Sequence, residues 1–69
     1  MQLSEFLRKT RQDKGQTQLE AAAEVGVHVQ TWSNWERGLP TSNVHVLERI
    51  ADWGQTTVSK LSSMVRGAA

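Results

Sequence analysis

The chain has 69 residues, no cysteine and a formal net charge of +1, which predicts one small domain over residues 1–69 without disulfides and fits a reducing cytoplasm. The charge is too small to indicate a nucleic-acid partner from composition alone. No apolar run is long enough to span a bilayer and the N-terminus lacks the order of a signal peptide, so we expect a soluble, cytoplasmic protein without a membrane partner.

Apolar side chains at helical spacing predict a first helix from about Leu3 to Lys14, with Gly15 as its stop. Four basic residues crowd into seven positions on its polar side: Arg8, Lys9, Arg11 and Lys14. A solvated helix face explains such a cluster taken alone. Phosphate contact is the use we expect for part of it, if a neighbouring element binds nucleic acid.

The second predicted helix begins at Thr17, because Thr17 and Glu20 have the spacing of a capping box, in which each side chain satisfies a backbone N–H of the first turn. Gly26 ends it, since glycine tolerates the left-handed conformation that closes a helix. We expect its apolar surface to come from four residues: Leu19, Ala22, Ala23 and Val25.

The third predicted helix begins at Val29, where the helical spacing of side chains resumes, and stops at Gly38. At roughly 100° per residue, Trp32 and Trp35 fall on one side, which predicts that both are core residues. The other side collects polar side chains: Gln30, Ser33, Asn34 and Arg37. Amide, hydroxyl and guanidinium groups match the donors and acceptors of base edges and phosphates. This face therefore indicates DNA contact, with ordinary helix surface as the alternative.

Leu39 and Pro40 predict an extended segment, after which Thr41, Ser42 and Asn43 offer caps for a fourth helix. Its apolar stripe consists of Val44, Leu47, Ile50 and Ala51, and Gly54 is its expected end. Trp53, next to that end, is expected either to close the core or to lie at a subunit contact.

Thr56 or Thr57 is the expected cap of a final helix, in which Val58, Leu61 and Val65 repeat the apolar pattern before a frayed end at residues 67–69. Five short helices without a strand pattern predict a compact all-α domain. A disordered or strand-forming C-terminal end is the alternative.

A wider pattern spans the second and third helices. Gln18, Ala22, Gly26 and Val27, followed by Trp-Glu-Arg-Gly at residues 35–38, resemble the helix-turn-helix of the lambda-type phage repressor and Cro proteins, the broad Xre-like group. The likeness runs from about Phe6 to Leu61. The chain departs from the family at Leu19, where a polar residue is usual, and at Ala21, where a leucine is usual, so the apolar face of this helix is open to rotation or repacking.

The resemblance implies a five-helix lambda-repressor-like domain with its helix-turn-helix at about Thr17–Arg37. It implies a small phage or prophage Cro-like repressor that binds a palindromic operator in double-stranded DNA. A single recognition helix contacts few base pairs, so the resemblance also implies a homodimer with two such helices about 34 Å apart. We expect the dimer contact at the loop around Leu39 and at the last helix, from about Trp53 to Val65.

The same resemblance places the helix that begins at Val29 in the major groove. Gln30 would then pair with N6 and N7 of adenine, Asn34 would read a neighbouring base, and Val29 would touch a thymine methyl group. Ser33 completes the base-reading candidates, although its short side chain, like that of Thr31, favours phosphate or water-mediated contact.

Phosphate contacts are expected from Gln18, because the family uses this glutamine at a helix N-terminus, where free N–H groups favour an anion. Arg11 aligns with an arginine that pairs with the glutamate of Trp-Glu-Arg-Gly, here Glu36, near a phosphate; a purely structural ion pair is the alternative. His28 stands at the cap of the third helix, where histidine is a poorer cap than serine. Either the helix starts one residue away or the imidazole reaches a phosphate. The remaining phosphate candidates are Arg8, Thr17, Thr31, Arg37, Thr41 and Ser42.

The main alternative is an antitoxin-type or other protein-interaction module with autoregulatory DNA binding. We do not expect an enzyme, because the seven carboxylates are scattered and no Gly-rich phosphate loop occurs. Two histidines without cysteine do not make a metal site. The sequence thus predicts no cofactor, no metal and no small-molecule substrate.

Overall fold

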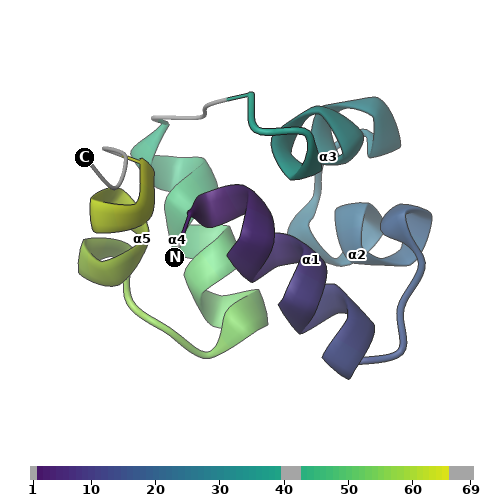
Figure 1. Cartoon of the computed structure of the whole chain (residues 1–69), viewed down its shortest axis with the longest axis horizontal. Helices are drawn as coiled ribbons and strands as arrows, with labels where there is room; N and C mark the ends of the chain where they lie inside the picture. The colour runs from purple at the N-terminus through teal and green to yellow at the C-terminus, as the bar shows by residue number, and fades with distance from the viewer. Residues whose placement is uncertain (1, 40–42, 66–69) are drawn as a thin grey trace.

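Five α-helices occur in the part of the chain that the computed structural model describes, residues 2–39 and 43–65 (Figure 1). They are α1 (Leu3–Asp13), α2 (Gln18–Val25), α3 (Val29–Glu36), α4 (Val44–Gly54) and α5 (Val58–Val65). The predicted all-α class is confirmed, and helix α5 replaces the strand considered for this end. The predictions for Pro40, Thr41, Ser42 and residues 67–69 lie outside the described residues.

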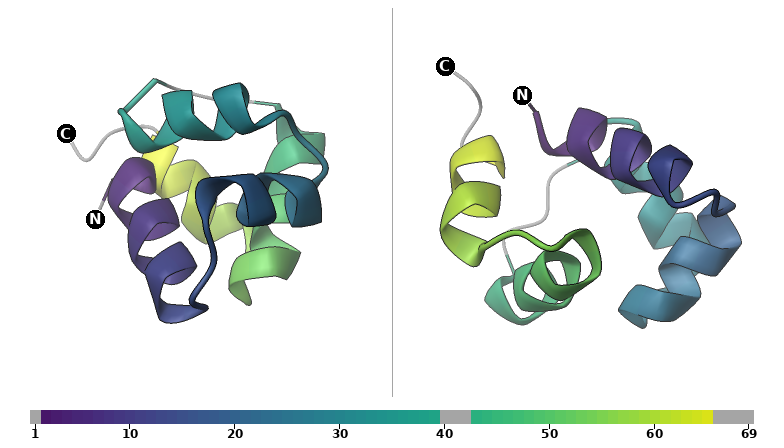
Figure 2. Two further views of the ribbon diagram at one scale, coloured as in Figure 1. Left: turned by 90° about the vertical axis from the view of Figure 1, so that its right-hand side faces the viewer. Right: turned by 90° about the horizontal axis from the view of Figure 1, so that it is seen from below.

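The helices of the motif occupy one end of the molecule. Helices α2 and α3 lie together at that end, α4 and α5 lie at the other, and α1 runs between them (Figures 1 and 2). Helix α3 packs on α2 and α1, while α4 contacts α2 and α5. Since α3 forms the upper edge of the molecule in Figure 1 and in the left view of Figure 2, one of its long sides faces away from the core.

The boundaries of α2 follow from local chemistry. The hydroxyl of Thr17 accepts the backbone N–H of Glu20 at 3.1 Å, and the Glu20 carboxylate accepts the backbone N–H of Thr17 at 2.8 Å. This is the predicted capping box. At the other end Gly26 has a φ of 88°, and its N–H donates to the carbonyl of Ala22 at 2.8 Å. The left-handed backbone explains the glycine.

Side chains also cap the last two helices. The Asn43 side-chain oxygen accepts the backbone N–H of His45 at 2.9 Å at the start of α4. The Thr57 hydroxyl accepts the backbone N–H of Lys60 at 3.2 Å, so Thr57 caps α5. Both helices therefore begin where the sequence predicts.

The prediction that Gly54 ends α4 is confirmed, but Gly54 is not the left-handed residue that closes the helix. Gly54 is the last residue of the helix, and the left-handed residue that follows is Gln55, with a φ of 54°. A Cβ atom at Gly54 would lie 2.8 Å from Cζ of Phe6. Glycine stands here because the aromatic ring from α1 approaches the α4 backbone closely.

The buried face of α2 also differs from the prediction. Leu19 is 64% exposed and Ala23 is exposed, so neither supplies core surface. Ala21 is fully buried instead, beside Ala22 and Val25. The face is therefore rotated relative to the predicted one. Because alanines fill it, α2 and α3 can approach closely.

The three tryptophans form the centre of the core. Trp32 is fully buried, and its ring centroid lies 5.8 Å from that of Trp35 and 4.9 Å from that of Trp53, in a T-shaped arrangement with the latter. Such tilted pairs are favourable beyond their buried area. The prediction for Trp32 and Trp35 is confirmed. Trp53, only 4% exposed, closes the core of its own chain.

Candidate nucleic-acid interface

The outward side of α3 carries a row of linked polar side chains. Gln30 and Arg37 are exposed, and Asn34 between them is half-buried. Nε2 of Gln30 donates to Oδ1 of Asn34 at 3.1 Å, and Nη2 of Arg37 donates to the same oxygen. The three side chains therefore stand together along one face of the helix, as the sequence predicts for a base-reading surface.

The inward side of α3 fixes this face in place. Trp32 and Trp35 fill the core behind it, so α3 cannot rotate without exposing two large apolar side chains. Residues between the outward and inward sides of α3 are partly buried. Val29 packs partly against the core, and Thr31 and Ser33 are half-buried. Among the predicted base-reading residues, Gln30 is therefore the most exposed and Val29 is partly committed to the interior.

His28 is the N-terminal cap of α3. Its Nδ1 accepts the backbone N–H of Gln30 at 3.0 Å, and the helix begins at Val29 as predicted. The imidazole thus supplies the capping hydrogen bond that a serine or threonine side chain usually supplies. The side chain is exposed, and its contact with a phosphate stays a prediction.

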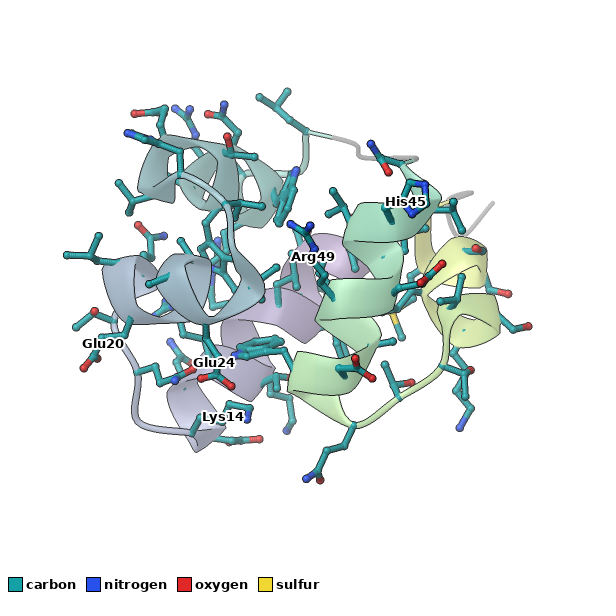
Figure 3. All side chains as sticks on the ribbon, turned by 180° about the vertical axis from the view of Figure 1, so that it is seen from behind. Lys14, Glu20, Glu24, His45 and Arg49 are labelled. Atoms are coloured by element: carbon teal, nitrogen blue, oxygen red, sulfur yellow. The ribbon has the colours of Figure 1, made fainter. Side chains whose placement is uncertain are left out.

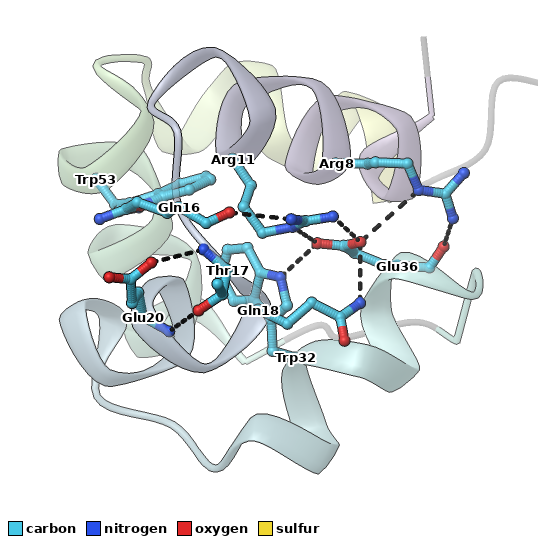
Figure 4. A network of polar contacts seen from close by, with 9 residues as sticks. All are labelled: Arg8, Arg11, Gln16, Thr17, Gln18, Glu20, Trp32, Glu36 and Trp53. Atoms are coloured by element: carbon cyan, nitrogen blue, oxygen red, sulfur yellow. Dashed lines mark hydrogen bonds and ion pairs between the residues drawn. The ribbon is translucent and has the colours of Figure 1, made fainter.

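A buried carboxylate joins the first three helices. Glu36 is 4% exposed. Its oxygens accept Nε of Arg11 at 2.7 Å, Nε1 of Trp32 at 2.5 Å and Nε2 of Gln18 at 3.1 Å (Figure 4). Nη2 of Arg11 adds a second bond at 3.2 Å. The Arg11–Glu36 pair implied by the resemblance is therefore present and doubly hydrogen-bonded.

The electrostatics of Glu36 follow from these partners. Burial raises the pKa of its carboxyl group, but the hydrogen bonds from Arg11, Trp32 and Gln18 and the positive charge of Arg11 outweigh that effect. The pKa therefore lies below its ordinary value of 4.5. Glu36 is an anion at neutral pH and holds α1, α2 and α3 together.

This network determines which predicted phosphate ligands face solvent. The Arg11 side chain is 16% exposed, and its Nη1 donates to the Gln16 carbonyl at 3.0 Å. The Gln18 amide nitrogen also points at Glu36, and the Thr17 hydroxyl is used in the capping box. Phosphate contact by these three residues stays a prediction, and each already has a structural role.

Arg8 is placed differently. Its side chain is 54% exposed, its Nε lies 3.7 Å from the Glu36 carboxylate, and its Nη2 donates to the Glu36 carbonyl at 2.8 Å. A cation near the last carbonyls of a helix is favourable. Arg8 thus stands at the C-terminal end of α3, where Arg37 is also exposed. Two cations border the polar face.

The acidic side chains of α2 lie on another side of the motif. Glu20 and Glu24 project from the side of α2 that is turned away from α3, and Glu24 lies near Lys14 (Figure 3). Arg49 of α4 lies near the turn between α2 and α3, with its Nη1 3.3 Å from the position of a Cβ at Gly26. The outer side of α3 is therefore not flanked by the carboxylates of α2.

Gln16 is a structural residue that the sequence analysis missed. Its Oε1 accepts Nε1 of Trp53 at 3.0 Å (Figure 4), and its Nε2 donates to the Glu24 carboxylate at 2.7 Å. It thereby ties the loop before α2 to α4. A buried indole N–H needs an acceptor, but nothing in the spacing of the sequence shows which residue supplies it.

Comparison with known proteins agrees with this geometry. The family model of a helix-turn-helix domain matches residues 2–59, which include α1 to α4. No curated protein and no solved structure matches the chain. Within residues 2–39 and 43–65, no helix is both long and apolar enough to cross a membrane. The match covers most of the chain and contains the whole α2–α3 unit, so the chain belongs to the helix-turn-helix domain family.

Proposed function

We propose that this protein is a sequence-specific transcription regulator that binds double-stranded DNA by placing α3 in the major groove. The observation that carries the proposal is the two-sided build of α3. Gln30, Asn34 and Arg37 line its outer face, while Trp32 and Trp35 are buried behind it. A helix presented in this way at the edge of a small domain fits the width of the major groove.

Base reading in this proposal centres on Gln30. Its side chain lies in the first turn of α3, the part that reaches base edges when a recognition helix enters the groove. Its amide can form two hydrogen bonds with adenine. Asn34 lies one turn further along the same face, and Val29 and Ser33 contribute from the flanks.

The phosphates on either side of the groove would be held by the surrounding polar groups. Arg8 and Arg37 supply exposed positive charge at the C-terminal end of α3. His28 and Thr31 lie at the N-terminal end of α3. Thr17 and Gln18 lie at the start of α2, and Arg11 lies on α1. These contacts position the helix without selecting a sequence.

We further propose that the protein acts as a phage or prophage Cro-like repressor and binds a palindromic operator as a homodimer. Leu39 and Val44, on either side of the α3–α4 connection, are 53% and 51% exposed. Leu39 also lines a pocket with Met64 and Val65 of α5. This apolar surface supports the expected dimer contact at the loop and α5. Trp53 takes no part, because it is buried in its own chain.

Selection of bound oligonucleotides from a random pool tests the proposal. We expect enrichment of a palindromic consensus, and Gln30→Ala should lose about 1–3 kcal/mol of binding free energy on it and relax the preference at one base pair. Gln12→Ala, which removes an exposed glutamine near the end of α1, is the matched control. Recovery of an unenriched pool would contradict the proposal, and a monomer both free and on the operator would contradict the dimer.

A further inference from the structure

Hydrogen bonds on the face of α3 determine which way its amides point. Arg37 donates through Nη2 to the side chain of Asn34. Because a guanidinium group has donors only, the atom that it meets must be the oxygen of the Asn34 amide. Gln30 bonds to the same atom at 3.1 Å and must therefore use its nitrogen. The donor-only chemistry of one arginine thus orients both amides.

The two amides are consequently unequal as readers of DNA. An amide oxygen has two lone pairs, and both lone pairs of Asn34 Oδ1 are occupied, by Gln30 and by Arg37. Asn34 keeps two N–H donors for an external partner and no acceptor. Gln30 keeps its oxygen and one N–H, which make one acceptor and one donor.

Adenine and guanine differ in the same respect, the number of donors and acceptors that they present. In the major groove adenine presents an acceptor at N7 and a donor at N6, whereas guanine presents two acceptors, N7 and O6. Gln30 matches adenine. We propose that Asn34 reads its base pair as a donor only and selects guanine over adenine, with Arg37 as the positioning residue that keeps its oxygen occupied. This inference rests on the proposed entry of α3 into the major groove.

The test compares operators that differ at a single base pair. A consensus is selected with the wild-type protein, and the position whose preference disappears in Asn34→Ala is the one that Asn34 reads. We expect guanine there, with an affinity at least about fivefold higher than that for adenine, since a bidentate pair discriminates by that much or more. Adenine at that position, or equal affinity for the two bases, would overturn the inference.

Substitutions of Arg37 test the positioning role. Arg37→Met frees a lone pair on Asn34 Oδ1, so the guanine-to-adenine affinity ratio should fall towards one. Arg37→Lys keeps a donor-only cation and should preserve most of the ratio. The ratio on two operators cancels the loss of a phosphate contact, which weakens binding to both alike. A ratio that Arg37→Met leaves unchanged would overturn the role.

The results also separate this inference from the proposed function. If no sequence is enriched by the wild-type protein, base reading by α3 is wrong and the inference falls with it. If a consensus appears and depends on Gln30, but adenine stands at the position that depends on Asn34, the proposed function holds and only the donor-only reading by Asn34 is refuted.

Discussion

Replacing Glu36 by glutamine removes the charge from the carboxylate that joins α1, α2 and α3. Its Oε2 accepts hydrogen bonds from Nε1 of Trp32 and Nε of Arg11. Its Oε1 accepts hydrogen bonds from Nη2 of Arg11 and Nε2 of Gln18. An amide offers only one oxygen, so either orientation turns an N–H pair towards two existing donors. The least costly arrangement places the new NH2 group beside Gln18, whose own amide can turn to accept. One hydrogen bond of Arg11 is still lost.

The size of the effect follows from this count. Arg11 is 16% exposed and would keep a mostly buried charge without an anionic partner. Breaking a buried ion pair costs about 3–5 kcal/mol, and the neutral acceptor that glutamine retains offsets part of it. We therefore expect a loss of about 2–3 kcal/mol in the free energy of unfolding. A domain of this size has a total of only about 3–10 kcal/mol, and each kcal/mol corresponds to about 4–8 °C in Tm.

The assay is urea and thermal unfolding followed by tryptophan fluorescence, since all three indoles lie in the core. Glu48→Gln is the matched control, because Glu48 is an exposed glutamate of α4 and its replacement should change stability by less than about 0.5 kcal/mol. Adding Arg11→Met to Glu36→Gln should recover part of the loss by removing the unpaired cation. A Glu36→Gln variant that melts together with the Glu48→Gln control would refute the reasoning.

Three further outcomes are expected. The pKa of Glu36 in the folded protein lies below 4.5, so its ionised form contributes its full stability above pH 4.5, and this contribution is lost as the pH falls through the folded-state pKa. The stability of Glu36→Gln, measured by unfolding at several acid pH values, should lack this pH-dependent loss. Gly54→Ala should lower Tm, since the new methyl group would lie 2.8 Å from the Phe6 ring, and the loss should shrink in a Phe6→Leu background. Arg8→Ala should weaken DNA binding about equally for all sequences and reduce the slope of log affinity against log salt concentration by about one, which titrations at several salt concentrations would measure. Loss of preference at one base pair would contradict this prediction.

The sequence predicts those features whose chemistry is local. The capping box of Thr17 and Glu20, the left-handed Gly26 and the helical spacing of Trp32 and Trp35 each depend on residues within a few positions, and the structure agrees with all of them. The ion pair of Arg11 with Glu36 is not local, and only the resemblance to a known family implied it.

Features decided by packing between distant segments were not predictable in this way. Leu19 is apolar yet 64% exposed, because α2 packs on α3 and α4 through its other side, where Ala21 is fully buried. Gly54 ends α4 as predicted, but the reason for a glycine there is the contact with Phe6 on α1, which the sequence does not show. The bond of Trp53 to Gln16 joins residues far apart in the chain. In each case the deciding partner lies on another segment of the chain.

The separation between the two sides of α3 bears on how the proposed regulator could diversify. The indoles and the Glu36 carboxylate that seat the helix are buried, while Gln30 and Arg37 are exposed and Asn34 is half-buried. If α3 reads bases as proposed, exchanging these side chains would change the preferred DNA sequence while the buried side of the helix stays the same. New binding sites could thus arise through a few surface mutations on an unchanged scaffold, which makes this domain a convenient starting point for engineered switches.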